Sequence, residues 1–166
     1  MVNGGQVEPK SNILNWRQID GQISTSGQPT EAQLAELRDK GVTQVINLGP
    51  HSNKGALPDE KSSVEALGMR YIYIPVDFDG PTQADFDQFC AALDELAEQR
   101  VHVHCIYNAR VSAFFYRYAK ENNRDVEKAF ALMDGIWRPG GVWARFIGHG
   151  NDTDLPNRYL GYDYDA

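Results

Sequence analysis

The stretch VHVHCIYNARVSAFFYRYAK, residues 101–120, contains the transition from strand to helix that decides the fold. Residues alternate up to Cys105 as they do in a strand, and a helical pattern begins at Arg110. Four residues, IYNA, separate Cys105 from Arg110. A loop that leaves the carboxyl end of a strand and enters a helix is where α/β proteins place their ligand sites. The stretch therefore predicts an α/β protein with a ligand site between residues 105 and 110.

Strand-like and helix-like segments alternate through the rest of the chain, without an internal repeat. Short strands are expected over residues 13–19, 22–25, 42–48, 70–76 and 101–105. Helices are expected over residues 30–40, 60–68, 82–99, 110–122, 125–137 and 142–148, with Thr30 as the first N-cap. This order favours a single α/β domain with a mostly parallel or mixed sheet of about five strands, flanked by helices.

Length and composition fit one domain of ordinary size. The chain has 166 residues, of which 42% are hydrophobic and 11% aromatic, which is enough to bury a core. Residues 1–11 are expected to form a disordered lead-in, 12–150 the α/β domain, and 151–166 an acidic C-terminal tail.

The charge balance excludes one class of partner and leaves another open. A net charge of −7, from 16 basic and 23 acidic residues, argues against a general nucleic-acid binder, which needs a basic face. It does not exclude a small anion pocket, because a few backbone N–H groups and one Arg suffice. No apolar run approaches the roughly 18 residues that span a membrane. The start MVNGGQVEPKS lacks an apolar signal core, which fits a cytoplasmic protein or, after removal of a signal, a periplasmic or secreted one.

The two cysteines have different expected roles. Their spacing matches no zinc pattern, and two are too few for a disulfide scaffold. No cofactor is expected, and no metal is needed, because Arg110 and a helix N-terminus supply the positive field that a metal would. Cys90 belongs to an apolar helical stripe with Phe86, Phe89 and Leu93, and is expected to be a core residue. Cys105 at the end of a strand could also be buried and inert, as free cysteines usually are.

The surroundings of Cys105 nevertheless favour a reactive thiolate. A helix N-terminus and a nearby cation both stabilise a thiolate, and Arg110 follows five residues later. The same N–H groups, from Ile106, Tyr107, Asn108 and Ala109 to Arg110, are expected to bind phosphate, with a planar bidentate grip from Arg110. Ser112 lies on the first helical turn, where its hydroxyl could donate to the Cys105 sulfur. Of His102 and His104, which alternate along the strand, one is expected to be a satisfied core or edge histidine.

The segment HCIYNARVS resembles the loop of the cysteine-dependent protein tyrosine and dual-specificity phosphatases. More closely, the chain is similar to bacterial phosphatase-like proteins of the DUF442 group, related to the beta-lactamase-hydrolase-associated phosphatase domain. The resemblance runs from about Asn12 to Gly148 through ISTSGQPT (23–30), VINLGP (45–50), YIPVDFDGPT (73–82), VHVHCIYNARVSAF (101–114) and GIWRPGGVWARFI (136–147). It implies the phosphatase fold, an attacking Cys105 and a phosphate-binding Arg110.

The loop departs from the family pattern, in which five residues rather than four stand between Cys and Arg. The shorter loop offers one N–H donor fewer, and it lacks the usual glycines, so Asn108 is the residue expected to take a left-handed conformation. Phosphate binding should tolerate this change. In-line attack is more sensitive, because an error of about 1 Å can cost roughly a hundredfold in rate.

A general acid must protonate the departing oxygen when a thiolate cleaves a phosphate ester. In the resembling phosphatases this is an Asp on a loop before the Cys, and DFDGP (77–81) is such a loop. Asp79 is expected to be the acid and then the base, with Asp77 in reserve. The alternative is that both only solvate the loop or form a turn.

Other polar residues are candidates for the rim of the site. Ser26 and Gln28, in SGQP, could touch substrate or position water, or could belong to a simple connecting turn. Asn47 is expected to form hydrogen bonds at a strand end. Trp137 and Arg138 could border the site, although an aromatic residue at a helix end more often belongs to the core.

The sequence therefore predicts a cysteine-dependent phosphomonoester phosphatase that works through a phosphocysteine. Its partner would be a phosphorylated substrate, either a phosphoprotein or a small phosphate ester, or inorganic phosphate or sulfate, and not nucleic acid or membrane. Two alternatives remain: a non-catalytic phosphate- or sulfate-binding pseudophosphatase, which the short loop motivates, and a sulfurtransferase with a persulfide on Cys105.

Overall fold

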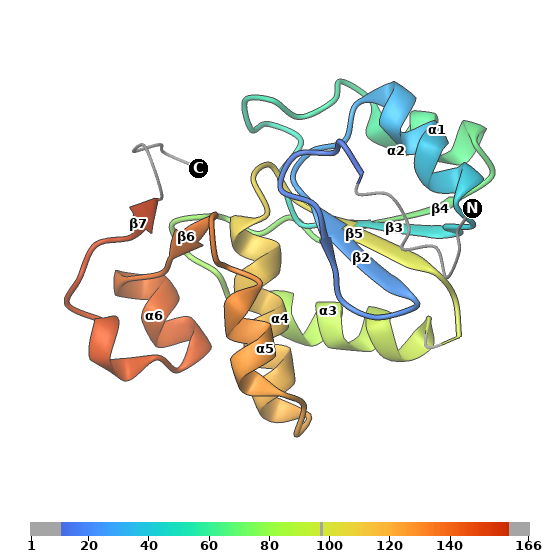
Figure 1. Cartoon of the computed structure of the whole chain (residues 1–166). Helices are drawn as coiled ribbons and strands as arrows, with labels where there is room; N and C mark the ends of the chain where they lie inside the picture. Colours follow the sequence, from blue (N-terminus) through green and yellow to red (C-terminus); the bar gives the residue numbers. More distant parts are fainter. Residues whose placement is uncertain (1–10, 97, 160–166) are drawn as a thin grey trace.

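A five-stranded sheet forms the centre of the protein in the computed structural model, which describes residues 11–96 and 98–159 (Figure 1). The strands lie in the order β1-β2-β5-β3-β4, with β1 antiparallel to β2 and all other pairs parallel. Their bounds are Arg17–Gln18 for β1, Ile23–Ser26 for β2, Gln44–Asn47 for β3, Arg70–Tyr73 for β4 and Val101–His104 for β5. This mixed sheet confirms the fold class that the sequence predicts.

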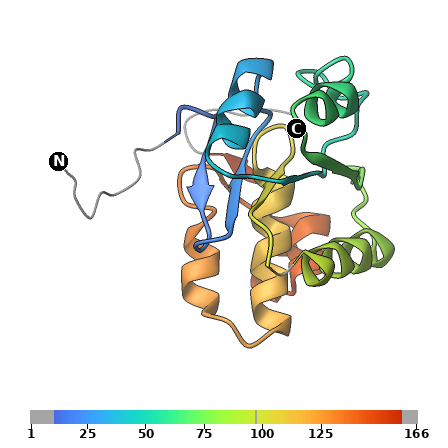
Figure 2. The same cartoon turned by 90° about the vertical axis from the view of Figure 1, so that its right-hand side faces the viewer.

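Helices cover both faces of the sheet. On one face lie α1 and α2, and on the other α3 and α4, with α5 and α6 packed against α4 (Figures 1 and 2). Their bounds are Glu31–Asp39 for α1, Glu60–Ala66 for α2, Gln83–Glu95 for α3, Ala109–Glu121 for α4, Val126–Ala131 for α5 and Gly141–Ile147 for α6. A 3-10 turn η1, Gly150–Asp152, and a small antiparallel pair, β6 (Trp137–Arg138) with β7 (Arg158–Tyr159), complete the chain.

Each face of the sheet has its own apolar core. Val45 on β3 packs with Leu34, Leu37 and Val64 of α1 and α2. The next residue, Ile46, belongs to the larger core under α3, α4 and α6. Successive side chains of a strand point to opposite faces, so a strand covered on both sides reads as a continuous apolar run.

The helix starts follow their local sequence. Thr30 accepts from Gln33 N at 3.1 Å, while the Gln33 side chain accepts from Thr30 N at 2.9 Å. Thr82 and Asp85 form the same reciprocal capping box at the start of α3. Each box satisfies two N–H groups that a helix start leaves without partners, which explains why these helices begin where the sequence predicts.

The strand register brings several loops together at one edge of the sheet. His104, the last residue of β5, lies opposite Ser26 of β2 and Asn47 of β3. The segments that follow β2, β3, β4 and β5 therefore leave the sheet at the same edge. This is the carboxyl edge, where ligand sites of parallel sheets lie.

The helix expected over residues 125–137 is shorter than predicted. It ends at Ala131, and the chain turns through Gly135, whose φ is 79°, into β6. Arg17 explains part of this change, because its guanidinium donates to Leu132 O at 3.2 Å and to Asp134 O at 2.7 Å. These carbonyls accept from a residue distant in sequence, a contact that helical periodicity cannot reveal.

The chain ends were expected to lie outside the domain. Residues 1–10 of the expected lead-in and 160–166 of the expected tail lie outside the described residues. Residues 151–159 are not a separate tail: they complete η1 and form β7, where Tyr159 stacks on Trp137 with 6.1 Å between ring centroids. Within the described part of the chain, no helix combines the length and the apolar character that crossing a membrane requires.

Candidate active site

The site is built around the short loop between β5 and α4. Cys105 follows β5 with 0% of its surface exposed, and Arg110 lies in the first turn of α4 with 1% exposed. Asn108 has φ 69° and ψ 17°, the left-handed conformation that the sequence assigns to it. Its Nδ2 donates to Asn15 O at 2.9 Å and to Thr25 Oγ1 at 3.1 Å, and these contacts fix the turn.

Each backbone carbonyl from residue 105 to residue 109 accepts a hydrogen bond. In each case the donor lies outside the concave side of the loop. Cys105 O accepts from His104 Nδ1 at 2.9 Å, and Ile106 O from Gln28 N at 3.0 Å. Tyr107 O accepts from Asn15 Nδ2 at 2.8 Å. The carbonyls of Asn108 and Ala109 accept from the backbone N and the hydroxyl of Ser112, at 3.2 and 3.0 Å.

The C=O and N–H of one peptide group point in opposite directions. Carbonyls that face away from the centre of the loop therefore direct the N–H groups of the following residues toward it. Among the described residues, no hydrogen bond uses the N–H of Ile106, Asn108 or Ala109 as donor. Successive N–H groups that converge on one point form a nest for an anion, at a helix N-terminus that favours negative charge. The geometry of this loop is therefore suited to binding an oxyanion beside Cys105.

Arg110 supplies a buried cation at the same place. Its Nη2 donates to Asn53 Oδ1 at 3.0 Å, and its guanidinium carbon lies 5.2 Å from the centroid of the Phe78 ring. Its buried Nε has no hydrogen-bond partner among the described residues. A buried donor without a partner is unusual in a native protein and points to an acceptor supplied by a ligand.

The acidic loop after β4 lies beside Arg110. A hollow of about 440 Å³ is lined by the three consecutive residues Asp77, Phe78 and Asp79 together with Arg110 and Asn53. Asp77 Oδ1 accepts from Asp79 N at 2.9 Å, which makes Asp77 the residue that forms the turn. Trp143 Nε1 donates to Phe78 O at 2.7 Å and ties this loop to α6.

Ser112 has a different hydrogen bond from the one expected. Its hydroxyl donates to Ala109 O at 3.0 Å and accepts from Trp137 Nε1 at 3.2 Å. A hydroxyl has one proton, and Ala109 O takes it, so this arrangement leaves none for the Cys105 sulfur. Trp137 is buried and supports the loop through Ser112, while Arg138 pairs with Asp134 away from the anion site.

Ser26 and Gln28 differ in their positions. Ser26 is fully buried, so it does not line the rim of the site. Its hydroxyl forms hydrogen bonds with Gly27 O at 2.6 Å and with His102 Nε2 at 2.7 Å. The cause is the β2 register, which turns its side chain onto β5. Gln28 lines a hollow that also contains Ile106 and reaches Asn53. At Gly27 an added Cβ would lie 2.5 Å from Ile106 O, so only glycine lets this segment approach the loop.

His102 is the core histidine that the alternation predicts. Because Ser26 donates its proton to Gly27 O, it accepts from His102 Nε2, while His102 Nδ1 accepts from Ser24 at 2.8 Å. The ring is therefore neutral. Burial lowers its pKa well below the ordinary value, and the charges of His104 and Lys40 lower it further.

Glu60 is a buried polar residue of the site that sequence reasoning missed. Its carboxylate meets His104 Nε2 at 2.5 Å and Gln28 Nε2 at 2.8 Å. Burial by itself raises the pKa of Glu60, but the charge of His104 and these hydrogen bonds outweigh burial, so the pKa is lowered. One signal was available: Glu60 precedes Val64 by one helical turn, which places both on the buried face of α2.

Two further expectations have clear outcomes. Cys90 lies partly buried in the α3 stripe, where burial, followed by the charges of Glu121, Asp94 and Asp87, raises its pKa to about 11. Asn47 forms the expected strand-end hydrogen bonds, accepting from Gly49 N at 2.7 Å and donating to the Tyr71 hydroxyl at 2.9 Å.

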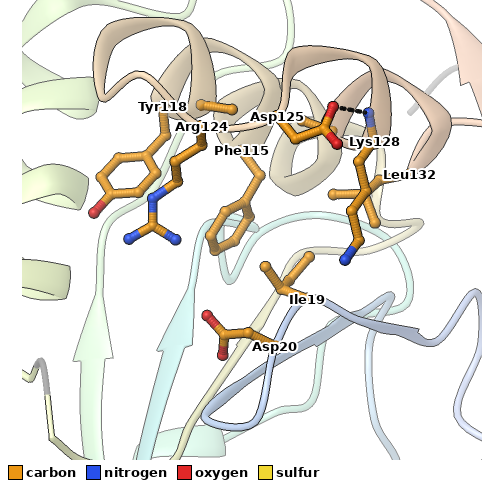
Figure 3. A pocket seen from close by; sticks show the side chains of 10 residues that line it. Ile19, Asp20, Phe115, Tyr118, Arg124, Asp125, Lys128 and Leu132 are labelled. Atoms are coloured by element: carbon orange, nitrogen blue, oxygen red, sulfur yellow. Dashed lines mark hydrogen bonds between the residues drawn. The ribbon is translucent and has the colours of Figure 1, made fainter.

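A separate hollow of about 380 Å³ lies near the opposite edge of the sheet (Figure 3). It opens between the β1–β2 turn, at Asp20, and the helices α4 and α5, with Phe115 and Leu132 in its wall and Arg124 and Lys128 beside them. It contains none of the expected site residues. The expected site residues therefore lie elsewhere, at the carboxyl edge of the sheet around Cys105.

A thiol between a parallel strand and a helix, an inward ring of N–H groups and an Arg on the first helical turn define the class of cysteine-dependent phosphatases of the protein tyrosine and dual-specificity type. The chain belongs to the family described as "DSP-PTPase phosphatase fused to NAD+ Kinase", whose sequence model matches residues 6–138. This confirms the resemblance found in the sequence.

Similar solved structures include the DUF442 protein of Shewanella putrefaciens CN-32. One structure of it is 36% identical, with a TM-score of 0.74, over 83% of this chain and 91% of that chain. TpbA of P. aeruginosa in complex with pTyr is 18% identical, with a TM-score of 0.60, over 73% of this chain and 72% of that chain, and it shows the shared fold.

A curated relative comes from Agrobacterium fabrum. Its beta-lactamase hydrolase-like protein is 34% identical over 90 residues, which are 52% of this chain and 21% of the relative. Two beta-lactamase hydrolase-like proteins of Xylella fastidiosa are 29% identical over the same length. The chain thus matches about a fifth of the length of these curated relatives.

Proposed function

We propose that the protein is a cysteine-dependent phosphomonoester phosphatase. The observation that carries the proposal is the loop itself: all carbonyls from Cys105 to Ala109 are held outward, while Arg110 keeps a buried, unpaired Nε beside the acidic loop. Such a site would offer convergent donors to a tetrahedral oxyanion, and Cys105 is the first residue of the loop that carries them.

The reaction proceeds in two steps in this proposal. The Cys105 thiolate attacks phosphorus, the bond to the leaving oxygen breaks, and Asp79 donates its proton to that oxygen. Water then attacks the phosphocysteine while Asp79 takes its proton, which releases inorganic phosphate and the thiolate. Arg110 and the loop N–H groups hold the oxyanions throughout and stabilise the charge that builds up in each transition state.

Asp79 is favoured over Asp77 by their hydrogen bonds. The Asp77 carboxylate already closes a turn by accepting from Asp79 N. The Asp79 side chain lines the hollow with Arg110, and within residues 11–96 and 98–159 it has no side-chain hydrogen bond that would divert it. An acid must be within reach of the leaving oxygen before its proton affinity matters.

The substrate class is a phosphate monoester. TpbA, whose fold the chain shares, was solved with pTyr, and another neighbour of the same fold is the core catalytic domain of the PP-IP phosphatase SIW14 from S. cerevisiae. The feature common to such ligands is a terminal phosphoryl group, which is what the Cys105 loop is shaped to hold.

The test compares purified wild-type protein with Cys105→Ser on a generic aryl phosphate. We expect turnover by the wild type, none above background by Cys105→Ser, and full turnover by the control Cys90→Ser. Equal turnover by the wild type and Cys105→Ser would contradict the mechanism. Phosphate or sulfate binding that survives Cys105→Ser, without any wild-type turnover, would instead identify an anion-binding pseudophosphatase, the role that the short loop also allows.

A further inference from the structure

Glu60 carries a buried carboxylate that the two-step mechanism does not use. It is the first residue of α2, with 1% of its surface exposed. Each oxygen accepts one hydrogen bond, Oε2 from His104 Nε2 at 2.5 Å and Oε1 from Gln28 Nε2 at 2.8 Å. A charged group is rarely buried to this degree unless it is paired, so the two donors are what keep the carboxylate here.

His104 links this carboxylate to the nucleophile. Its Nδ1 lies 2.9 Å from Cys105 O, and a carbonyl oxygen only accepts, so Nδ1 carries a hydrogen. The carboxylate of Glu60, whose pKa is lowered, lies against Nε2 of the same ring at 2.5 Å. The His104 ring therefore bridges the Glu60 carboxylate and the first carbonyl of the loop.

Gln28 gives Glu60 a second connection to the same loop. Its side chain donates to Glu60, and its backbone N donates to Ile106 O at 3.0 Å. The Glu60 carboxylate thus fixes both residues that contact the first two loop carbonyls, His104 at Cys105 O and Gln28 at Ile106 O. Those two carbonyls decide which way the first N–H groups of the anion nest point.

The other titratable groups around Glu60 are compatible with an ionised Glu60 carboxylate. His102 lies 6.4 Å from His104, centroid to centroid, and is neutral. Tyr71 on β4 feels the charge of Glu60, and burial raises its pKa, so it stays protonated. His51, from the loop after β3, also lies close enough to favour the ionised form of Glu60.

We propose that Glu60 is a positioning residue for Cys105: through His104 and Gln28 it holds the first two carbonyls of the loop away from the anion site, so that the N–H groups of the loop stay directed toward that site. The proposal rests on the proposed function, because it assigns Glu60 a role in preparing that nucleophile. Glu60 itself touches neither substrate nor sulfur.

The experiment measures the thiolate of Cys105 directly, by its ultraviolet absorbance as pH is varied. A Cys90→Ala background makes Cys105 the only thiol of the chain. Glu60→Gln keeps the shape of the side chain and removes its charge. Without the carboxylate, His104 and Gln28 lose the acceptor that fixes them, so the first N–H groups of the loop are held less firmly around the anion site, and we expect the thiolate-to-thiol ratio of Cys105 at neutral pH to fall about tenfold.

Glu65→Gln is the matched control, because it makes the same charge change on an exposed position of the same helix. It should leave the titration of Cys105 unchanged. A Glu60→Gln protein that retains its circular dichroism and titrates like the Cys90→Ala parent would overturn the proposal.

Removing one member of a buried ion pair can prevent folding, so a second variant is needed. Glu60→Gln with His104→Asn leaves no unpaired buried charge, and an Asn amide can still donate to Cys105 O. We expect the same loss of thiolate, since the carboxylate that fixes the donors at positions 104 and 28 is gone. Parent-like titration by this double variant would equally contradict the role of Glu60.

The two proposals can fail separately. Absence of aryl phosphate turnover in the wild type would count against the phosphatase, yet the thiolate titration would still report on Glu60. Conversely, an unchanged titration in Glu60→Gln, together with normal turnover, would remove only the role of Glu60.

Discussion

In the proposed site, we expect anion binding to depend on the planar shape of the Arg110 guanidinium more than on its charge. The group stacks on Phe78, donates to Asn53 and keeps Nε free for a ligand, and a planar fork is needed for all three contacts. For Arg110→Lys we therefore expect an unchanged fold and roughly a hundredfold lower kcat/KM for an aryl phosphate.

Steady-state kinetics and circular dichroism check this expectation. Arg117→Lys is the control, because Arg117 lies on the same helix and stacks on Phe86 and Phe146 rather than at the site. If Arg110→Lys kept wild-type kcat/KM, the bidentate grip assigned to Arg110 would be refuted.

The two aspartates of the acidic loop can be separated by one substitution each. Asn at position 77 can still accept from Asp79 N and close the turn, so Asp77→Asn should change kcat by less than about threefold. Asp79→Asn removes the proposed acid, and we expect about a hundredfold lower kcat on an ester with a poor leaving group.

The pH profile distinguishes a lost acid from a distorted loop. Without Asp79, the limb of the kcat profile that reports the acid should disappear, and the deficit should shrink for esters whose leaving group needs no proton. Comparable deficits in both variants would mean that neither carboxylate acts alone as the acid.

At the scale of elements, α6 positions the acidic loop from outside. Trp143 donates its indole N–H to Phe78 O at 2.7 Å, and its ring packs on that of Phe78 with 5.6 Å between centroids. Trp143→Phe keeps an aromatic ring and removes the donor, leaving the carbonyl of Phe78 without this partner. We expect a loss of about 1–3 kcal/mol in the free energy of unfolding, and a several-fold lower kcat.

Urea unfolding and kinetics on one preparation test this link. The informative quantity is kcat at a temperature where the variant is fully folded. If kcat remains at the wild-type value there, the contact contributes to stability alone, and α6 does not position the acid.

At the scale of the whole molecule, local patterns predict the frame and long-range contacts decide the details. The capping box of Thr30 and Gln33 is contained within four neighbouring residues, so the start of α1 could be predicted. The end of α5 could not, because the carbonyls of Leu132 and Asp134 accept from Arg17, more than a hundred residues earlier. Hydrophobic periodicity contains no information about such a partner.

The same division applies to the site. The order of strand, Cys105, Arg110 and helix is contiguous, and the sequence predicts both the loop and the left-handed Asn108. Glu60 is 44 residues from His104 along the chain, and its role depends on the register of parallel strands and the packing of α2. Ser26 was misplaced for a related reason, since the face of β2 on which it lies is set by pairing with β5.

Buried His102 makes the stability of the whole molecule depend on pH. Its pKa in the folded protein lies well below the ordinary value of 6.5, so below that pH the unfolded chain binds a proton that the folded protein does not. Stability therefore falls as the pH drops below about 6.5. Glu60, with its lowered pKa, adds a loss in the same direction, but only at lower pH, near the ordinary carboxyl value of 4.5.

Between these two pH values, we assign the pH dependence of the free energy of unfolding to His102. We expect the free energy of unfolding, measured in urea, to fall by up to about 1.4 kcal/mol per pH unit below pH 6 through this single proton. His102→Gln should flatten the slope, because its amide cannot titrate, whatever its effect on absolute stability. Ser24→Ala is the control: it removes a hydrogen bond to the ring at 2.8 Å but leaves the ring in place, so it should lower stability and keep the slope. An unchanged slope in His102→Gln would show that another group takes up the proton, since only the titrating residue can remove that dependence when it is replaced.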